Sequence, residues 1–109
     1  MSASLVYITA ADAEEAKALG RALVEARLAA CANVLPGITP IYRWEGRIEE
    51  GTEVALIAKT RSELVERVVA LVIERHSYDC PCVIALPITG GNPDYLAWID
   101  TETAENASN

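Results

Sequence analysis

Short apolar runs and helical repeats follow one another along the chain, and this pattern predicts most of its elements. The run LVYIT (Leu5 to Thr9) is short, β-branched and almost wholly apolar, which predicts a buried strand. Two later runs have the same character: EVALIAK from residue 53 and CVIALPI from residue 82. Other segments carry apolar residues every three or four positions, which is the spacing of an amphipathic helix.

A first helix is predicted directly after the first strand. Asp12 and Glu15 are three residues apart and resemble a capping box, in which two side chains accept hydrogen bonds from the first backbone amides of a helix. Apolar residues then recur at helical spacing, at Ala16, Leu19, Leu23 and Ala26.

Two more helices are predicted in the C-terminal half. Thr60 and Glu63 repeat the capping signal, and an amphipathic pattern continues to about His76 through Leu64, Val68, Leu71 and Val72. The segment GGNPDYLAWID predicts a turn and then a short helix that begins near Pro93. The chain ends in small and polar residues, so we expect a frayed tail over about residues 103–109.

The segment from residue 31 to residue 60 predicts a long, irregular β-hairpin. It contains two strand-like runs, with Gly46 and Gly51 as turn residues. Pro36, Gly37 and Pro40 interrupt the first run, so we expect its pairing to be irregular.

The predicted order β-α-β-β-α-β is that of the ferredoxin-like split β-α-β unit, an α+β sandwich with two helices on one face of a four-stranded antiparallel sheet. Residues 1–109 are expected to form one such domain, with the short C-terminal helix added. A second face that met water would alternate polar and apolar residues, yet the predicted strands are apolar at nearly every position. We therefore expect further copies of the chain to cover that face.

Charge and composition limit the classes of partner and the cellular compartment that we expect. Nine Lys and Arg against sixteen Asp and Glu give a net charge of -7, which disfavours nucleic acid and anionic membranes as partners and favours cations. The sequence shows neither a secretory signal pattern nor an apolar stretch long enough to span a membrane. Its odd number of cysteines, three, then indicates reduced thiols in the cytoplasm.

The stretch RHSYDCPC contains the only histidine and two of the three cysteines. Cys80 and Cys82 flank a proline, and alternate residues of an extended segment point to the same side. Two thiolates with His76 nearby suit a soft cation such as Cu(I), whereas a closed zinc site needs four ligands. The alternative is that Cys82 begins a buried strand as a small apolar residue, and that His76 has a capping or surface role at the end of its helix.

Other chemistry has less support in the sequence. A redox pair fits the cysteines least, because a disulfide across one intervening residue is strained. Cys31, in the alanine-rich run LAACA, is predicted to lie in the core. No phosphate-binding glycine loop, nucleophile elbow or metalloprotease helix is present, and a single histidine limits acid–base schemes, so we do not expect an enzyme.

Most of the aromatic residues are expected to pack between subunits, where Tyr and Trp are common anchors. The functional alternative is a cleft at a subunit boundary, lined by these rings, with Lys59 and Glu45 as polar contacts. The rings are those of Tyr42, Trp44, Tyr78, Tyr95 and Trp98.

Four motifs, RLAACANVLPG, IYRWEG, EVALIAKT and PITGGNPDYLAWI, resemble in sequence, order and spacing those of the divalent-cation tolerance family (CutA). The resemblance covers about Leu5 to Ile99. It implies a ferredoxin-like fold assembled as a homotrimer, with hairpins that cross to neighbouring subunits, and a role in tolerance to copper and other divalent cations. Because the nitrogen-regulatory PII proteins share this fold and trimeric plan, small-molecule sensing is the competing hypothesis.

The chain departs from the family pattern at its chemically important positions. The family commonly has His-Pro-Tyr followed by Pro-Glu, where this chain has Ser77 and Cys82 in place of the proline and the glutamate. Where copper ligands are assigned in the family, the corresponding positions here are Ile8, Arg75 and His76, of which His76 alone is a metal ligand type. The sequence therefore favours a homotrimer that binds or responds to metal ions and requires no cofactor, although copper or another divalent cation is a candidate ligand.

Overall fold

The structure is a computed structural model that describes residues 2–104. Its elements are β1 (Ala3–Ala10), α1 (Ala13–Glu25), β2 (Cys31–Ile38), β3 (Ile41–Trp44), β4 (Arg47–Glu50), β5 (Glu53–Arg61), a 3-10 turn η1 (Ser62–Leu64), α2 (Val65–Arg75), β6 (Val83–Ile88) and α3 (Pro93–Ala104). No helix within residues 2–104 is both long and apolar enough to cross a bilayer.

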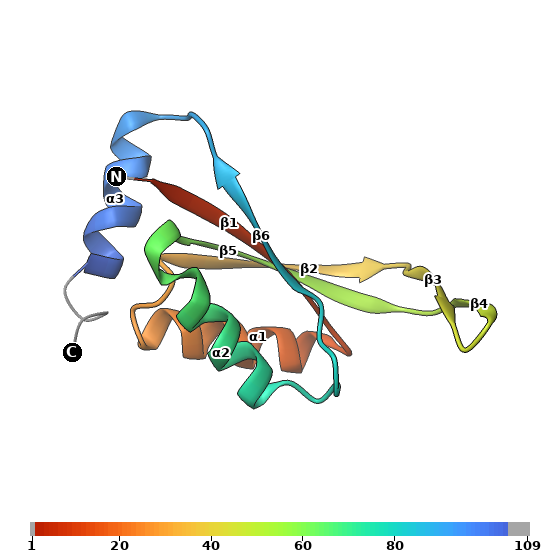
Figure 1. Ribbon diagram of the computed structural model, residues 1–109. Coiled ribbons are helices and arrows are strands. Elements are labelled where there is room, and N and C mark those ends of the chain that lie inside the picture. Colours follow the sequence, from red (N-terminus) through yellow and green to blue (C-terminus); the bar gives the residue numbers. More distant parts are fainter. Residues whose placement is uncertain (1, 105–109) are drawn as a thin grey trace.

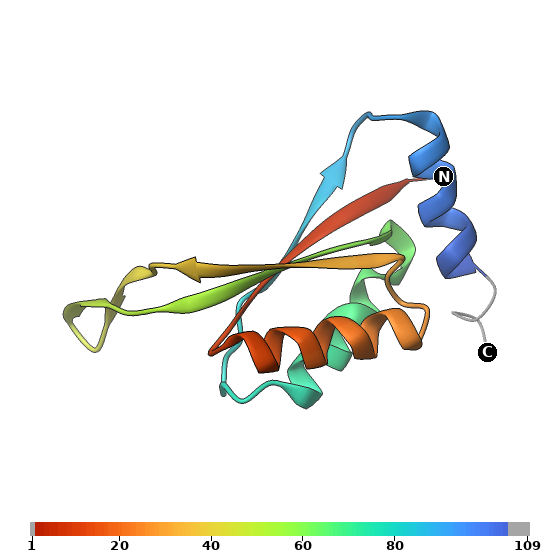
Figure 2. The ribbon, with the colours of Figure 1, turned by 180° about the vertical axis from the view of Figure 1, so that it is seen from behind.

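The central sheet confirms the predicted α+β class and the order of its elements. Its four strands are antiparallel in the order β2-β5-β1-β6, and α1 and α2 lie together on one face (Figure 1; Figure 2). Side chains at alternate positions of β1 and β5 meet the helices there and are fully buried, including Val6, Ile8, Leu56 and Ala58. Leu19 and Leu23 of α1 and Val68 and Val72 of α2 complete this core.

The first helix begins where the capping pattern predicts. Asp12 accepts a hydrogen bond of 2.8 Å from the Glu15 amide. The Glu15 carboxylate reaches back to the amide of Ala11 at 3.0 Å, one residue earlier than in the usual capping box. Local sequence therefore determines this helix start.

The end of α1 carries a left-handed residue that is not glycine. Arg27 has φ of 59°, and its amide and that of Leu28 bond to the carbonyls of Val24 and Leu23, which is the Schellman pattern. Glycine is the usual residue at this position because it has no Cβ penalty. The Arg27 guanidinium instead donates to the Thr101 carbonyl of α3 at 3.2 Å, so this residue links two helices.

The second capping prediction is wrong. Thr60 lies inside β5, and its hydroxyl donates to the buried carbonyl of Leu28 at 2.6 Å. The helix α2 begins only at Val65, after the 3-10 turn, and has no side-chain cap. Strand pairing and burial determine the role of Thr60, although the local pattern Thr-x-x-Glu is typical of a helix start.

The predicted long hairpin is divided into two parts. Only β2 and β5 belong to the main sheet, and a β-bulge interrupts their pairing between Leu35 and Ile38. Beyond it, β3 and β4 form a separate two-stranded ribbon, here called the arm, which projects from the sheet (Figure 1). Glu45 and Gly46 have φ of 49° and 81°, as in the type I′ turn that suits a two-residue hairpin loop.

The sheet face opposite α1 and α2, here called the open face, is covered only at one end. The strand registers place Leu5, Leu35, Ile57, Ile84 and Leu86 on it. In the single chain Leu35, Ile84 and Leu86 are 42%, 55% and 50% exposed. The sequence predicts this apolar face correctly, but not that α3 would cover its end beside the start of β1 and the end of β5.

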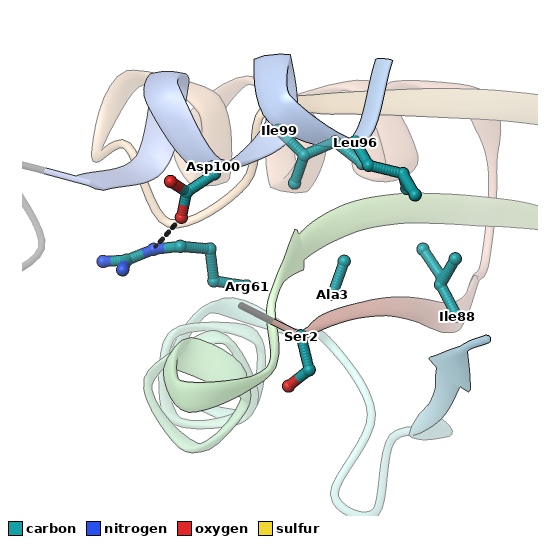
Figure 3. A pocket seen from close by; sticks show the side chains of 7 residues that line it. All are labelled: Ser2, Ala3, Arg61, Ile88, Leu96, Ile99 and Asp100. Carbon is teal, nitrogen blue, oxygen red and sulfur yellow. Dashed lines mark ion pairs between the residues drawn. The ribbon is translucent and has the colours of Figure 1, made fainter. Parts of the chain in front are cut away.

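Two kinds of contact hold α3 against the sheet. Ile99 is buried, and Figure 3 shows it with Leu96 beside a cavity of about 50 Å³ that Arg61 and Asp100 also border. The Arg61 guanidinium lies 3.8 Å from the Asp100 carboxylate and 3.0 Å from that of Glu63. A cavity of this size has room for ordered water but not for a metabolite.

The C-terminal helix is longer than predicted. Thr103 and Ala104 belong to α3, and the Thr103 side chain is fully buried, with its hydroxyl donating to the Ile99 carbonyl at 2.8 Å. The predicted frayed tail therefore does not begin at residue 103. Its remaining part, residues 105–109, lies outside the described residues.

We expect Gly20→Val to destabilise the fold. A Cβ at Gly20 would lie 3.1 Å from the Ala32 Cβ and 3.2 Å from Leu56 Cδ1, so valine would overpack the contact between α1 and the sheet. Overpacking of this kind costs about 1–3 kcal/mol. Gly90→Val is the control, because no heavy atom outside Gly90 and its two chain neighbours lies within 4 Å of its Cβ position. Equal unfolding midpoints in urea for the two variants would contradict the prediction.

Candidate functional site

His76 lies at the C-cap of α2 with its side chain fully buried. Its Nε2 is 2.7 Å from the Thr9 carbonyl oxygen, and its Nδ1 is 3.0 Å from the Tyr78 amide. Because a carbonyl can only accept, Nε2 donates, and because an amide can only donate, Nδ1 accepts. Both ring nitrogens are therefore occupied, and His76 can bind a metal only by giving up one of these bonds.

Glu15 links the start of α1 to the segment after α2. Its carboxylate accepts from the Ser77 amide at 2.7 Å as well as from Ala11, and it lies 3.6 Å from Nδ1 of His76. Partial burial raises the pKa of Glu15, but the hydrogen bonds from Ala11 and Ser77 outweigh it, and the pKa is lowered overall. Glu15 is therefore a carboxylate at neutral pH.

Tyr78 connects this network to the base of the arm. Its phenol donates to the Glu53 carboxylate at 2.7 Å, and its ring stands 4.7 Å from that of His76. Partial burial and then the bond to Glu53 raise the pKa of Tyr78 to about 12, and Tyr42 of β3 adds a smaller effect. Tyr42 and Tyr78, two of the predicted cleft residues, thus interact electrostatically within one chain.

The two cysteines after α2 differ in exposure. Cys80 is exposed, whereas Cys82 is partly buried and extends the pairing of β6, because its carbonyl accepts from the Thr9 amide at 3.3 Å. Among residues 2–104, no three His, Cys, Asp or Glu side chains are grouped so that they could hold a metal ion. His76, Cys80 and Cys82 therefore do not form a three-ligand site within the single chain. At the other positions carried over from the family, Ile8 is fully buried and Arg75 is exposed.

Cys31 is not the core residue that the sequence predicts. It is partly exposed, and its Sγ lies 3.3 Å from the Tyr95 hydroxyl of α3. Its position follows from strand register, which places Cys31 opposite Lys59 on the open face rather than beneath the helices. The alanines around it gave no sign of which face it would occupy.

Lys59, Tyr95 and Trp98 come together where α3 covers the open face. The Lys59 ammonium donates to the Asn33 side-chain oxygen at 2.6 Å and lies 5.8 Å from the centroid of the Tyr95 ring. The rings of Tyr95 and Trp98 are 5.4 Å apart. Sequence reasoning missed Cys31 and Asn33, although their spacing of two along β2 was a signal that they share a face.

The remaining cleft residues lie on the arm. Tyr42 and Trp44 of β3 are 48% and 60% exposed, and Glu45 occupies the turn at the tip. The structure therefore brings the predicted cleft residues together in two groups, one at α3 and one around the arm and Tyr78. A single cleft lined by all of them would need a second copy of the chain.

Replacing Tyr78 with phenylalanine should lower stability and flatten its alkaline pH dependence. The change removes a hydrogen bond to a carboxylate, which is worth about 1–2 kcal/mol when partly exposed. Because the folded-state pKa is raised to about 12, the phenol's contribution is complete below the ordinary pKa of 10 and is lost as the pH rises toward 12. Urea unfolding at a series of pH values measures both effects. Tyr7→Phe is the control, and an unchanged alkaline slope in Tyr78→Phe would contradict the assignment.

Comparison with known proteins identifies the family. The model of the CutA1 divalent ion tolerance protein family matches residues 4–102. The divalent-cation tolerance protein CutA of Archaeoglobus fulgidus is 47% identical over 102 residues, which cover 94% of this chain and 98% of that protein. The chloroplastic protein CutA of Arabidopsis thaliana is 46% identical over 99 residues, or 91% of this chain, but these are only 54% of that protein. The chain thus spans about half the length of this plant relative.

The structures agree with the sequences. The crystal structure of CutA1 from Oryza sativa superposes with a TM-score of 0.93 at 42% sequence identity and covers 96% of both chains. A match of this quality includes the sheet, the helices on one face and the arm. The chain therefore belongs to the CutA1 divalent ion tolerance family.

Proposed function

We propose that this protein is a cytoplasmic homotrimer that supports tolerance to divalent cations by binding or responding to metal ions such as copper, and that it is not an enzyme. The observation that carries the proposal is the family match over residues 4–102, because divalent ion tolerance is the property for which the family is named. The net charge of -7 supports an affinity for cations. The same match favours this function over the second hypothesis, a PII-like sensor of a small molecule.

Self-association is supported by the apolar surface that a single chain leaves in water. The open face exposes Leu35, Ile84 and Leu86, and the arm exposes Ile41 and other large apolar side chains. Stable monomers rarely expose contiguous apolar patches of this kind. Copies of the chain packed through the open face, with each arm on a neighbour, would bury both surfaces.

We propose the thiols of Cys80 and Cys82, after α2, as the metal ligands. Cys80 is exposed, and Cys82 lies two residues further on. Cu(I) accepts few ligands and prefers sulfur, so two thiolates could bind it without His76, whose nitrogens are already hydrogen-bonded. A divalent ion that prefers nitrogen or oxygen ligands would find fewer suitable groups here.

We expect the purified protein to have a mass three times that of the 11.7 kDa chain in light scattering. Ile84→Glu should dissociate it, because a carboxylate would be placed in the buried contact. Ile73→Glu is the matched control, since Ile73 has the same 55% exposure but lies on α2, away from the open face. A folded monomer of the parent chain, or equal masses for the two variants, would refute the assembly.

We also expect Cys80→Ser with Cys82→Ser to weaken Cu(I) binding by at least about tenfold, or about 1.4 kcal/mol, while the assembly is retained. Cys31→Ser is the control, because that cysteine belongs to the group at α3. If Cys82 is instead a packing residue, Cys82→Ser alone should lower the free energy of unfolding by about 1–3 kcal/mol. A double variant that binds Cu(I) as the parent does would eliminate this site.

A further inference from the structure

Lys59 differs from the other cationic side chains that have no carboxylate partner. Within residues 2–104, Arg27, Arg47 and Arg61 lie within 4.0 Å of a carboxylate. Five of the remaining cations are exposed to water, namely Lys17, Arg21, Arg43, Arg67 and Arg75. Lys59 alone is partly buried, on a sheet face that is otherwise largely apolar.

The contacts of Lys59 within the described chain are with uncharged groups. Its ammonium donates to the Asn33 amide oxygen at 2.6 Å and faces the Tyr95 ring. The hydrogen bond with the Cys31 thiol and partial burial raise the pKa of Tyr95, against the opposing effect of Lys59, so Tyr95 is a neutral phenol at pH 7. The ammonium is therefore held in place by neutral groups while its charge is left uncompensated.

An uncompensated ammonium at this position has an energetic cost. Removing a charged group from water without an opposite charge is unfavourable, and the cost increases as the surroundings become drier. If further copies cover the open face, as proposed above, Lys59 loses still more water. A bound anion would offset this cost, and the neutral neighbours would orient the ammonium toward it.

The surroundings also indicate the kind of anion. The Tyr95 ring lies 5.8 Å from the cation, and the Trp98 ring lies 5.4 Å beyond it, with each residue 40% exposed. Phosphate sites usually combine an Arg fork or several backbone amides, and neither is present among the contacts of Lys59. A carboxylate needs only one ammonium and one or two donors, and an attached aromatic or apolar body would stack on the rings.

We propose that Lys59, with Asn33, Tyr95 and Trp98, forms a binding site for a small organic carboxylate that carries an aromatic or apolar body. The site is distinct from the thiols after α2, and it is independent of the metal proposal. A carboxylate from the arm of a neighbouring copy is the competing occupant, because Glu45, Glu49 and Glu50 lie on the arm.

Benzoate is the probe, and the two lysines of the chain make the first test internally controlled. The complete, reduced protein is reductively methylated with and without millimolar benzoate, and the modification of each lysine is read by peptide mass mapping. We expect benzoate to protect Lys59 by at least about threefold and to leave Lys17 unchanged, because only Lys59 would hold the anion. Benzamide, which has the same shape but no charge, should protect neither lysine.

Calorimetry with variants provides the second test, which does not depend on the reactivity of Lys59. Lys59→Met should weaken benzoate binding by at least about tenfold. Lys59→Arg, which keeps the charge but changes the geometry of the donors, should weaken it less, and Lys17→Met should bind benzoate as the parent does. Thermal unfolding confirms that each variant is folded. The proposal is overturned if the parent binds no benzoate, if inorganic phosphate protects Lys59 equally well, or if Lys59→Met changes only the oligomeric mass, which would identify the neighbouring arm as the occupant.

Discussion

α1 and α2 both pack on one face of the four-stranded sheet, so they leave the opposite, open face uncovered. The rest of the structure depends on this constraint. The α1 and α2 side forms a complete core of interlocking apolar side chains. On the opposite side, α3 covers only one end, so the remaining apolar strand residues stay in water in a single chain. The incomplete open face and the half-buried position of Lys59 on it follow from this imbalance, which the proposed assembly would remove.

The sequence was most informative where a signal was local and did not compete with burial. The capping pattern of Asp12 and Glu15 predicted the start of α1 because nearby amides satisfy both side chains. The same kind of pattern failed at Thr60, because the register between β1 and β5 places that residue inside a strand and its hydroxyl has a buried partner elsewhere. Strand registers, and therefore the faces that individual residues occupy, depend on contacts between distant segments, which no short motif describes.

The candidate sites show the same limit. The motif around residue 76 indicated a possible metal site. The partners of His76 are nevertheless Thr9, Glu15 and Tyr78, and only Tyr78 is near it in sequence. These hydrogen bonds give His76 a structural role and occupy both of its ring nitrogens. The neighbouring thiols of Cys80 and Cys82 are therefore the groups proposed to bind a metal. At α3, Cys31 and Asn33 join Lys59 only because β2 pairs with β5 in one particular register.

The Glu15 carboxylate accepts hydrogen bonds from two distant backbone amides, and this has a consequence for local unfolding. One oxygen of this carboxylate closes the first turn of α1, and the other holds the amide of Ser77, 62 residues later. Fraying of the helix start therefore releases the segment after α2, and release of that segment removes one of the two hydrogen bonds that hold the Glu15 side chain in place at the start of α1. The start of α1 and the segment after α2 should therefore open as a single cooperative unit. The rate of amide exchange at Ser77 would then report on the opening of α1, although the two are far apart in sequence.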